Sequence, residues 1–99
     1  MTFVSTQPEA LTAEAANLQA IGSALSAQNA AAAGPTIGVV PAAADEVSAL
    51  TAARFAAHAQ MYQVVSAQAA AIHEAFVRTL MASAGSYAAT EAANALAAA

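Results

Sequence analysis

The larger apolar residues in the first third of the chain recur at intervals typical of one face of an α-helix. Leu11, Leu18 and Leu25 are spaced by seven, and Ile21 lies on the adjoining row. Pro8 suits the first turn of a helix, where a missing N–H costs nothing, and Ser5, Thr6 or Gln7 can cap ahead of it. The pattern predicts a helix over about residues 8–33 with a narrow apolar seam.

Two glycines and two prolines then fall within GPTIGVVP, residues 34–41, which predicts a loop. The next segment begins with acids in its first turn, Asp45 and Glu46, and meets no proline or glycine before Gly85. We therefore expect a second helix over about 42–84, with Gly85 as its C-cap and 86–99 as a tail. Two helices joined by a short loop most simply form an antiparallel hairpin, so the fold class is all-α.

The second helix carries an apolar stripe that covers roughly half its circumference, which a narrow first helix cannot cover. Phe55, Tyr62 and Leu80 widen one flank of the stripe, and Val64 widens the other. The hairpin should therefore expose a long apolar surface, and such surfaces mark interaction sites. The residues predicted to contact a partner are Leu11, Leu18, Ile21, Leu25, Val47, Leu50, Arg54, Phe55, His58, Met61, Tyr62, Val65, Ile72 and Phe76.

Two polar residues, Arg54 and His58, interrupt the middle of this stripe. In one interpretation Arg54 extends along an edge to reach water and His58 finds a backbone carbonyl. In the other they meet acceptors on a partner, or Glu14 within the hairpin, and so specify how the helices align.

Composition narrows the function further, because alanine fills 35 of the 99 residues and leaves only 24 larger apolar side chains. Alanine contributes little burial energy but lets long helices approach closely. A net charge of −4 without any lysine argues against nucleic-acid binding, and the absence of cysteine excludes disulfides and thiolate sites. Polar residues break the longest uncharged stretch, 15–44, so no transmembrane helix is expected, and the N-terminus lacks a signal-peptide pattern.

Candidate chemistry is sparse. The two histidines, His58 and His73, are too far apart on a helix to share a metal ion, and no other metal-ligand spacing occurs. His73 and Glu74 do not complete a zinc-protease motif, since position 77 is valine, and the loop 34–41 lacks the residues of a phosphate-binding loop. We expect a binding or export module without enzyme activity, cofactor or metal.

An ordered set of features resembles the PE family of mycobacteria over essentially the whole chain. These are the Pro8–Glu9 pair, the alanine-rich hairpin, VVPAAADEVSAL at 39–50, and a tyrosine followed four residues later by an acid. AAHAQMYQ at 56–63 and SAQAAAIHEAFV at 66–77 are similar to short PE proteins of the fifth ESX system, members without a glycine-rich extension.

The resemblance implies an obligate heterodimer in which the two helices complete a four-helix bundle with a PPE protein. It implies assembly in the cytoplasm and export of the folded pair by a type VII (ESX) secretion system, with the secretion chaperone contacting only the PPE subunit. Residues 1–85 would form the PE domain and 86–99 a tail that carries the secretion signal, Tyr87 and Glu91. The pair would act outside the cell or in its envelope, in host interaction or transport.

Spacing alone allows another interpretation of Tyr87 and Glu91, as two exposed residues of a disordered tail. If helical, they share one face and offer an aromatic ring and an acid to a receptor. Two other functions remain open for the chain: a membrane-active or pore-associated protein that places the stripe on lipid, and a self-associating homodimeric bundle.

Overall fold

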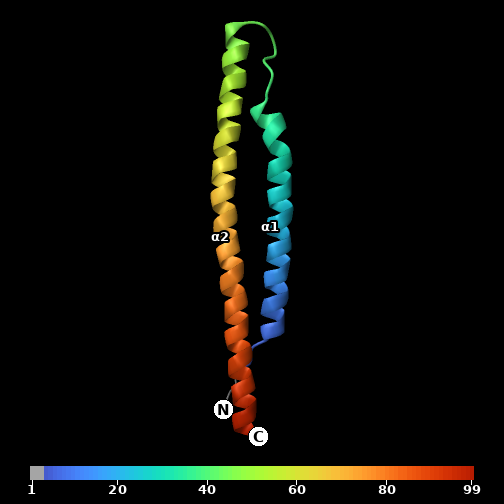
Figure 1. The fold of residues 1–99 in the computed structure, drawn as a ribbon, viewed down its shortest axis with the longest axis vertical. Helices are drawn as coiled ribbons and strands as arrows, with labels where there is room; N and C mark the ends of the chain where they lie inside the picture. Colours follow the sequence, from blue (N-terminus) through green and yellow to red (C-terminus); the bar gives the residue numbers. More distant parts are fainter. Residues whose placement is uncertain (1–3) are drawn as a thin grey trace.

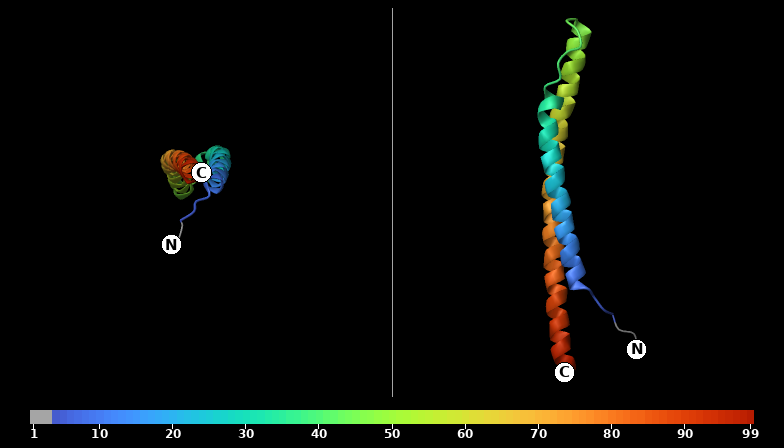
Figure 2. Two further views of the ribbon diagram at one scale, coloured as in Figure 1. Left: turned by 90° about the horizontal axis from the view of Figure 1, so that it is seen from below. Right: turned by 90° about the vertical axis from the view of Figure 1, so that its right-hand side faces the viewer.

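The computed structural model describes residues 4–99, which fold into two antiparallel helices, α1 (Pro8–Ile37) and α2 (Glu46–Ala98), joined by a loop over residues 38–45. The helices lie side by side along their length, and α2 extends beyond the start of α1 (Figures 1 and 2). The molecule measures 81 × 19 × 19 Å, and its longest dimension matches the roughly 80 Å expected for a helix of 53 residues. The predicted all-α hairpin is confirmed.

The start of α1 follows from its first residues. Pro8 occupies the first turn as predicted, and Gln7 is the N-cap, but its side chain makes no capping hydrogen bond. Its carbonyl instead accepts from the N–H groups of Ala10 and Leu11, at 3.0 and 3.2 Å. Glu9 lies in the first turn, where its negative charge complements the helix dipole.

The predicted end of α1 near residue 33 is wrong, because the helix continues to Ile37 with Pro35 inside it. Proline removes one backbone donor, but so close to the helix end this frees a single carbonyl on the exposed Ala31. The hydroxyl of Thr36 donates to the carbonyl of Ala32 at 2.6 Å, and the N–H of Gly38 donates to Gly34 at 2.9 Å. These bonds hold the last turn together.

The second helix starts at Glu46, not at 42, because Asp45 is its N-cap. One carboxylate oxygen of Asp45 accepts from the N–H of Ser48 at 3.0 Å, and the other accepts from the Ser48 hydroxyl at 2.7 Å. The Ser48 side chain and backbone together hold the pKa of Asp45 below its usual value. The cap is charged at neutral pH and lies where the helix dipole favours an anion.

The prediction that α2 ends at Gly85 is also wrong, since the helix runs through it to Ala98. A glycine terminates a helix by adopting a positive φ, and no glycine among residues 4–99 does so. Helix-forming alanines dominate the sequence after Gly85, so propagation continues past the single unfavourable residue. Residues 86–98 are therefore a helical extension.

The contact between the helices is made of small side chains. In α2 it comprises two rows spaced by seven residues, which we call the inner seam: Ala52, Ala59, Ser66, His73 and Leu80, and Ala56, Gln63, Ala70, Val77 and Ala84. Five side chains in the described part of the molecule are buried, and four of them are alanine: Ala15, Ala52, Ala59, Val77 and Ala84. Small residues let the two backbones approach closely along the whole contact.

No helix in the described chain is both long and apolar enough to cross a membrane.

Candidate interaction surfaces

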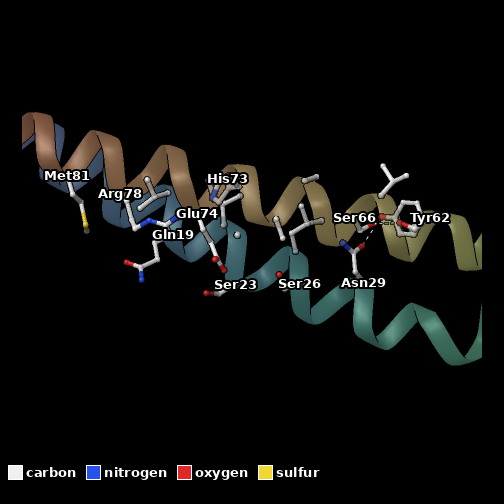
Figure 3. A pocket seen from close by; sticks show the side chains of 17 residues that line it. Gln19, Ser23, Ser26, Asn29, Tyr62, Ser66, His73, Glu74, Arg78 and Met81 are labelled. Carbon is white, nitrogen blue, oxygen red and sulfur yellow. Dashed lines mark hydrogen bonds between the residues drawn. The ribbon is translucent and has the colours of Figure 1, made fainter.

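Near the loop, two side chains of α2 hold Asn29 of α1. The Tyr62 hydroxyl donates to the side-chain oxygen of Asn29 at 2.7 Å, and the Gln63 amide donates to its backbone carbonyl at 2.9 Å. Tyr62, which the sequence analysis assigned to a partner surface, thus also ties the hairpin together, although its side chain is about half exposed. Figure 3 shows the Tyr62–Asn29 contact.

Midway along the hairpin, His73 reaches across to α1. Its Nε2 lies 2.6 Å from the carbonyl oxygen of Leu18, a hydrogen bond in which the histidine N–H donates. The ring fits because the neighbouring residue of α1 is Gly22, where an added Cβ would lie 2.7 Å from His73 Cδ2. The sequence pattern suggested such a carbonyl contact for His58, but His73 makes it instead. Gly22 could have indicated the contact from the sequence, since a glycine within a predicted helix often marks close packing.

Large apolar side chains lie mostly outside this contact. Of the fourteen residues predicted to bind a partner, Leu11 and Leu18 are half-buried between the helices, and the others are exposed. Phe76 exposes 55% of its surface, Ile72 exposes 72% and Met61 exposes 67%. The expectation that the hairpin leaves its larger apolar residues uncovered is therefore met.

These exposed residues do not share one direction. Measured from the inner seam, Val47, Arg54 and Met61 form a row that points directly away from α1, and Leu50 lies toward one side. The remaining large residues lie toward the opposite side, which we call the apolar flank. It consists of Ile21 and Leu25 of α1 and of Phe55, Tyr62, Val65, Ile72 and Phe76 of α2.

An open groove follows the junction of the helices, and side chains from both line it (Figure 3). Ile21, Leu25 and Val65 of the apolar flank contribute to its walls. Polar side chains also line it, among them Gln19, Ser23, Glu74 and Arg78. The groove therefore combines apolar side chains with charged ones.

Arg54 and His58 are exposed, and neither makes a hydrogen bond with another residue in the range 4–99. Within the same range, no three histidine or carboxylate side chains come close enough to bind a metal ion. The surfaces described here can bind another apolar molecule, and they bring no group of catalytic side chains together.

The tyrosine–acid pair lies at the far end of α2. Tyr87 is about half exposed, and Glu91 is half-buried because its carboxylate accepts a hydrogen bond of 2.9 Å from the hydroxyl of Thr6. Pro8 and Glu9 lie close by, where they line a shallow groove with Ala84, Gly85 and Ala88. The structure thus brings the Pro–Glu motif to the same end of the molecule as the tyrosine–acid pair.

Comparison with known sequences gives a consistent result. The model of the PE family matches residues 4–94. The chain is 69% identical over 98 residues to PE family protein PE13 of Mycobacterium tuberculosis, and the match covers 99% of both chains. It is 59% identical over 99 residues to PE family protein PE8 of that organism, where it spans 36% of the relative. It is 63% identical to PE-PGRS family protein PE_PGRS33, of which it spans 19%.

Proposed function

The chain belongs to the PE family, and from this premise we propose that it is the helical-hairpin subunit of a heterodimer with a PPE protein. Two PPE helices pack lengthwise on the hairpin and complete a four-helix bundle. A type VII (ESX) secretion system exports the folded pair after its assembly in the cytoplasm, and a chaperone engages it through the PPE subunit. The pair then acts outside the cell or in its envelope, in host interaction or transport.

The observation that carries this proposal is the amount and kind of surface left uncovered. The described residues expose 7423 Å², whereas a compact monomer of 9.7 kDa exposes about 5,100 Å². The excess includes the apolar flank, which extends from Phe55 to Phe76 of α2. The excess of exposed area is comparable to the area that obligate protein interfaces bury, and those interfaces are more apolar than transient ones. A pair of helices packed lengthwise has the shape to cover the flank.

Pairing is tested by placing a charge on the apolar flank. Phe76→Asp should abolish co-purification with a co-expressed PPE protein, because a carboxylate would be buried without a partner. Ala67→Asp is the matched control, since it adds the same charge to an exposed position on the other side of α2 and should leave recovery unchanged. Equal recovery of the PPE protein with both variants would show that this flank is not the interface.

The chain purified alone separates the two other functions. A cooperatively melting homodimer that ignores PPE proteins would support a self-associating bundle, and binding to liposomes would support a membrane-active protein. Aggregation that a PPE partner prevents is the result expected from the proposed heterodimer.

Export is tested at the tyrosine–acid pair. Tyr87→Ala should reduce the amount of the pair in the culture medium to near zero while the complex still forms in the cytoplasm. The reason is that Tyr87 lies beyond the region where the helices pack, so its loss removes a recognition group and leaves the bundle intact. Phe76→Asp should instead lose both pairing and export. Normal secretion of the Tyr87→Ala variant would exclude Tyr87 as the signal.

A further inference from the structure

The tyrosine–acid pair is a continuation of the inner seam. Counting seven residues on from Leu80 reaches Tyr87, and counting seven on from Ala84 reaches Glu91. Both side chains therefore occupy the side of α2 that faces α1 elsewhere in the hairpin. They face no helix because α1 begins at Pro8, which lies against Ala84 and Ala88.

The short segment before α1 occupies part of this vacant side. The Thr6 hydroxyl donates to Oε1 of Glu91 at 2.9 Å, and both residues are half-buried. They are 85 positions apart in the sequence, so the bond joins the two ends of the chain. The segment leaves the start of α1 at an angle to both helices, as Figure 2 shows.

The contact leaves most of the pair available to a receptor. Thr6 contacts one carboxylate oxygen of Glu91, and Oε2 takes no part in that bond. The ring of Tyr87, one helical turn earlier on the same face, remains 48% exposed. A glutamate on a helix is otherwise free to change rotamers, and a receptor would have to immobilise it when it binds.

We propose that the export signal is a composite surface built from both ends of the chain, in which Thr6 is a positioning residue that holds the Glu91 carboxylate beside Tyr87. This inference rests on the proposed function, because it assumes that the pair is the signal. It assigns a role to Thr6, and to Pro8, where α1 begins to cover the inner seam.

The test compares Thr6→Val with Thr6→Ser in the chain co-expressed with its PPE partner. Valine has the shape of threonine without the hydroxyl, whereas serine keeps the donor. Thr6→Val should lower the ratio of secreted to cellular protein by roughly tenfold, in line with the loss of one hydrogen bond to a charged group, and Thr6→Ser should stay close to wild type. Co-purification with the partner should be unchanged in both.

Thr12→Val is the matched control. The Thr12 hydroxyl lies in the same end of the molecule but donates to the carbonyl of Pro8, four residues earlier in α1, at 3.1 Å. Its loss should leave export unchanged. If residue 6 had only a structural role, Thr6→Val would lower pairing as well as export. Thr6→Ser would then behave no differently, although it keeps the hydroxyl.

Two results would overturn the inference. Unchanged export of Thr6→Val would show that the hydroxyl is not needed, and increased export would show that Thr6 masks the signal. Tyr87→Ala, run in parallel, separates this from the proposed function. If Tyr87→Ala is retained in the cell and Thr6→Val is exported normally, the signal stands and only its extension to Thr6 fails. If Tyr87→Ala is exported normally, the assignment of the signal itself fails.

Discussion

His73 of α2 reaches the backbone of α1 at a position where only glycine leaves room. The hydrogen bond to the Leu18 carbonyl and the missing side chain of Gly22 belong to one arrangement, because the ring lies over the glycine while it donates. Elsewhere the buried side chains are mainly alanine, and the other hydrogen bonds between the two helices are those that Tyr62 and Gln63 donate to Asn29 nearer the loop. At the residue scale, this histidine and this glycine specify which parts of the two helices face each other.

Gly22→Ala should therefore destabilise the hairpin, although alanine is the better helix former. The gain in propensity is about 1 kcal/mol, and the new Cβ displaces His73 from its hydrogen bond and strains the close contact. We expect a net loss of about 1–2 kcal/mol in the free energy of unfolding, measured with denaturant and far-UV circular dichroism on the protein with its partner.

Gly85→Ala is the control for this substitution. It lies in α2, and an added Cβ there meets nothing within 4 Å, so it should gain up to about 1 kcal/mol from propensity. If both variants were equally stabilised, the contact between His73 and Gly22 would carry no weight in the fold.

The two helices differ in what they contribute. α1 is 30 residues long and ends just past a proline, while α2 continues for 53 residues without a break. The last turns of α2 have no helix beside them, so they depend on their own alanine-rich sequence and on continuity with the packed part. This continuity keeps Tyr87 and Glu91 on one face and at a fixed angle to the rest of the hairpin.

A proline at position 85 would test the need for that continuity. Gly85→Pro removes the N–H that bonds to the carbonyl of Met81 and introduces a clash there, at a cost of about 3 kcal/mol within a helix. We expect lower helicity after residue 85, normal pairing through the apolar flank, and strongly reduced export. Gly85→Ala again serves as the control and should be exported normally. Full export of the proline variant would show that the signal works without a rigid connection to the hairpin.

The two helices could be predicted from the local sequence. Pro8, the acids at 45–46 and the small number of helix-breaking residues are enough to predict a hairpin. Their ends did not, because the prediction treated Pro35 and Gly85 as terminators when neighbouring residues allowed the helix to continue. The exposed apolar residues were also predictable from their spacing. The contacts of His73 and Thr6 were not, since each joins residues far apart in the sequence and depends on how the two helices align.

As a whole, the molecule is a thin rod, and residues 4–99 enclose no large, fully buried side chain. Its radius of gyration is 23.0 Å, whereas a compact domain of 99 residues has a value of about 13 Å. Five buried side chains cannot offset the conformational entropy that a chain of this length loses on folding. The larger apolar residues lie where only a second molecule can cover them.

The purified chain should therefore elute from size exclusion as an assembly larger than a monomer and should bind a dye specific for apolar surface. Addition of the PPE partner should give one elongated species with much lower dye fluorescence, and small-angle scattering should report its length. A monomer that melts cooperatively and binds no dye would mean that the hairpin is stable by itself.

The inner seam also has a consequence for how the two helices slide along each other. Six of its ten residues are alanine or serine and recur every seven positions, so a displacement by one repeat, about 10 Å, would bring small residues to many of the same places. If α1 shifted in this way toward the C-terminal end of α2, its first turns would cover Tyr87 and Glu91. The space beside Gly22, which has no side chain, accommodates the ring of His73 only when the two helices are aligned as observed. The contact of His73 with Gly22, together with the hydrogen bonds of Tyr62 and Gln63 to Asn29, thus determines how far the end of α2 projects beyond α1.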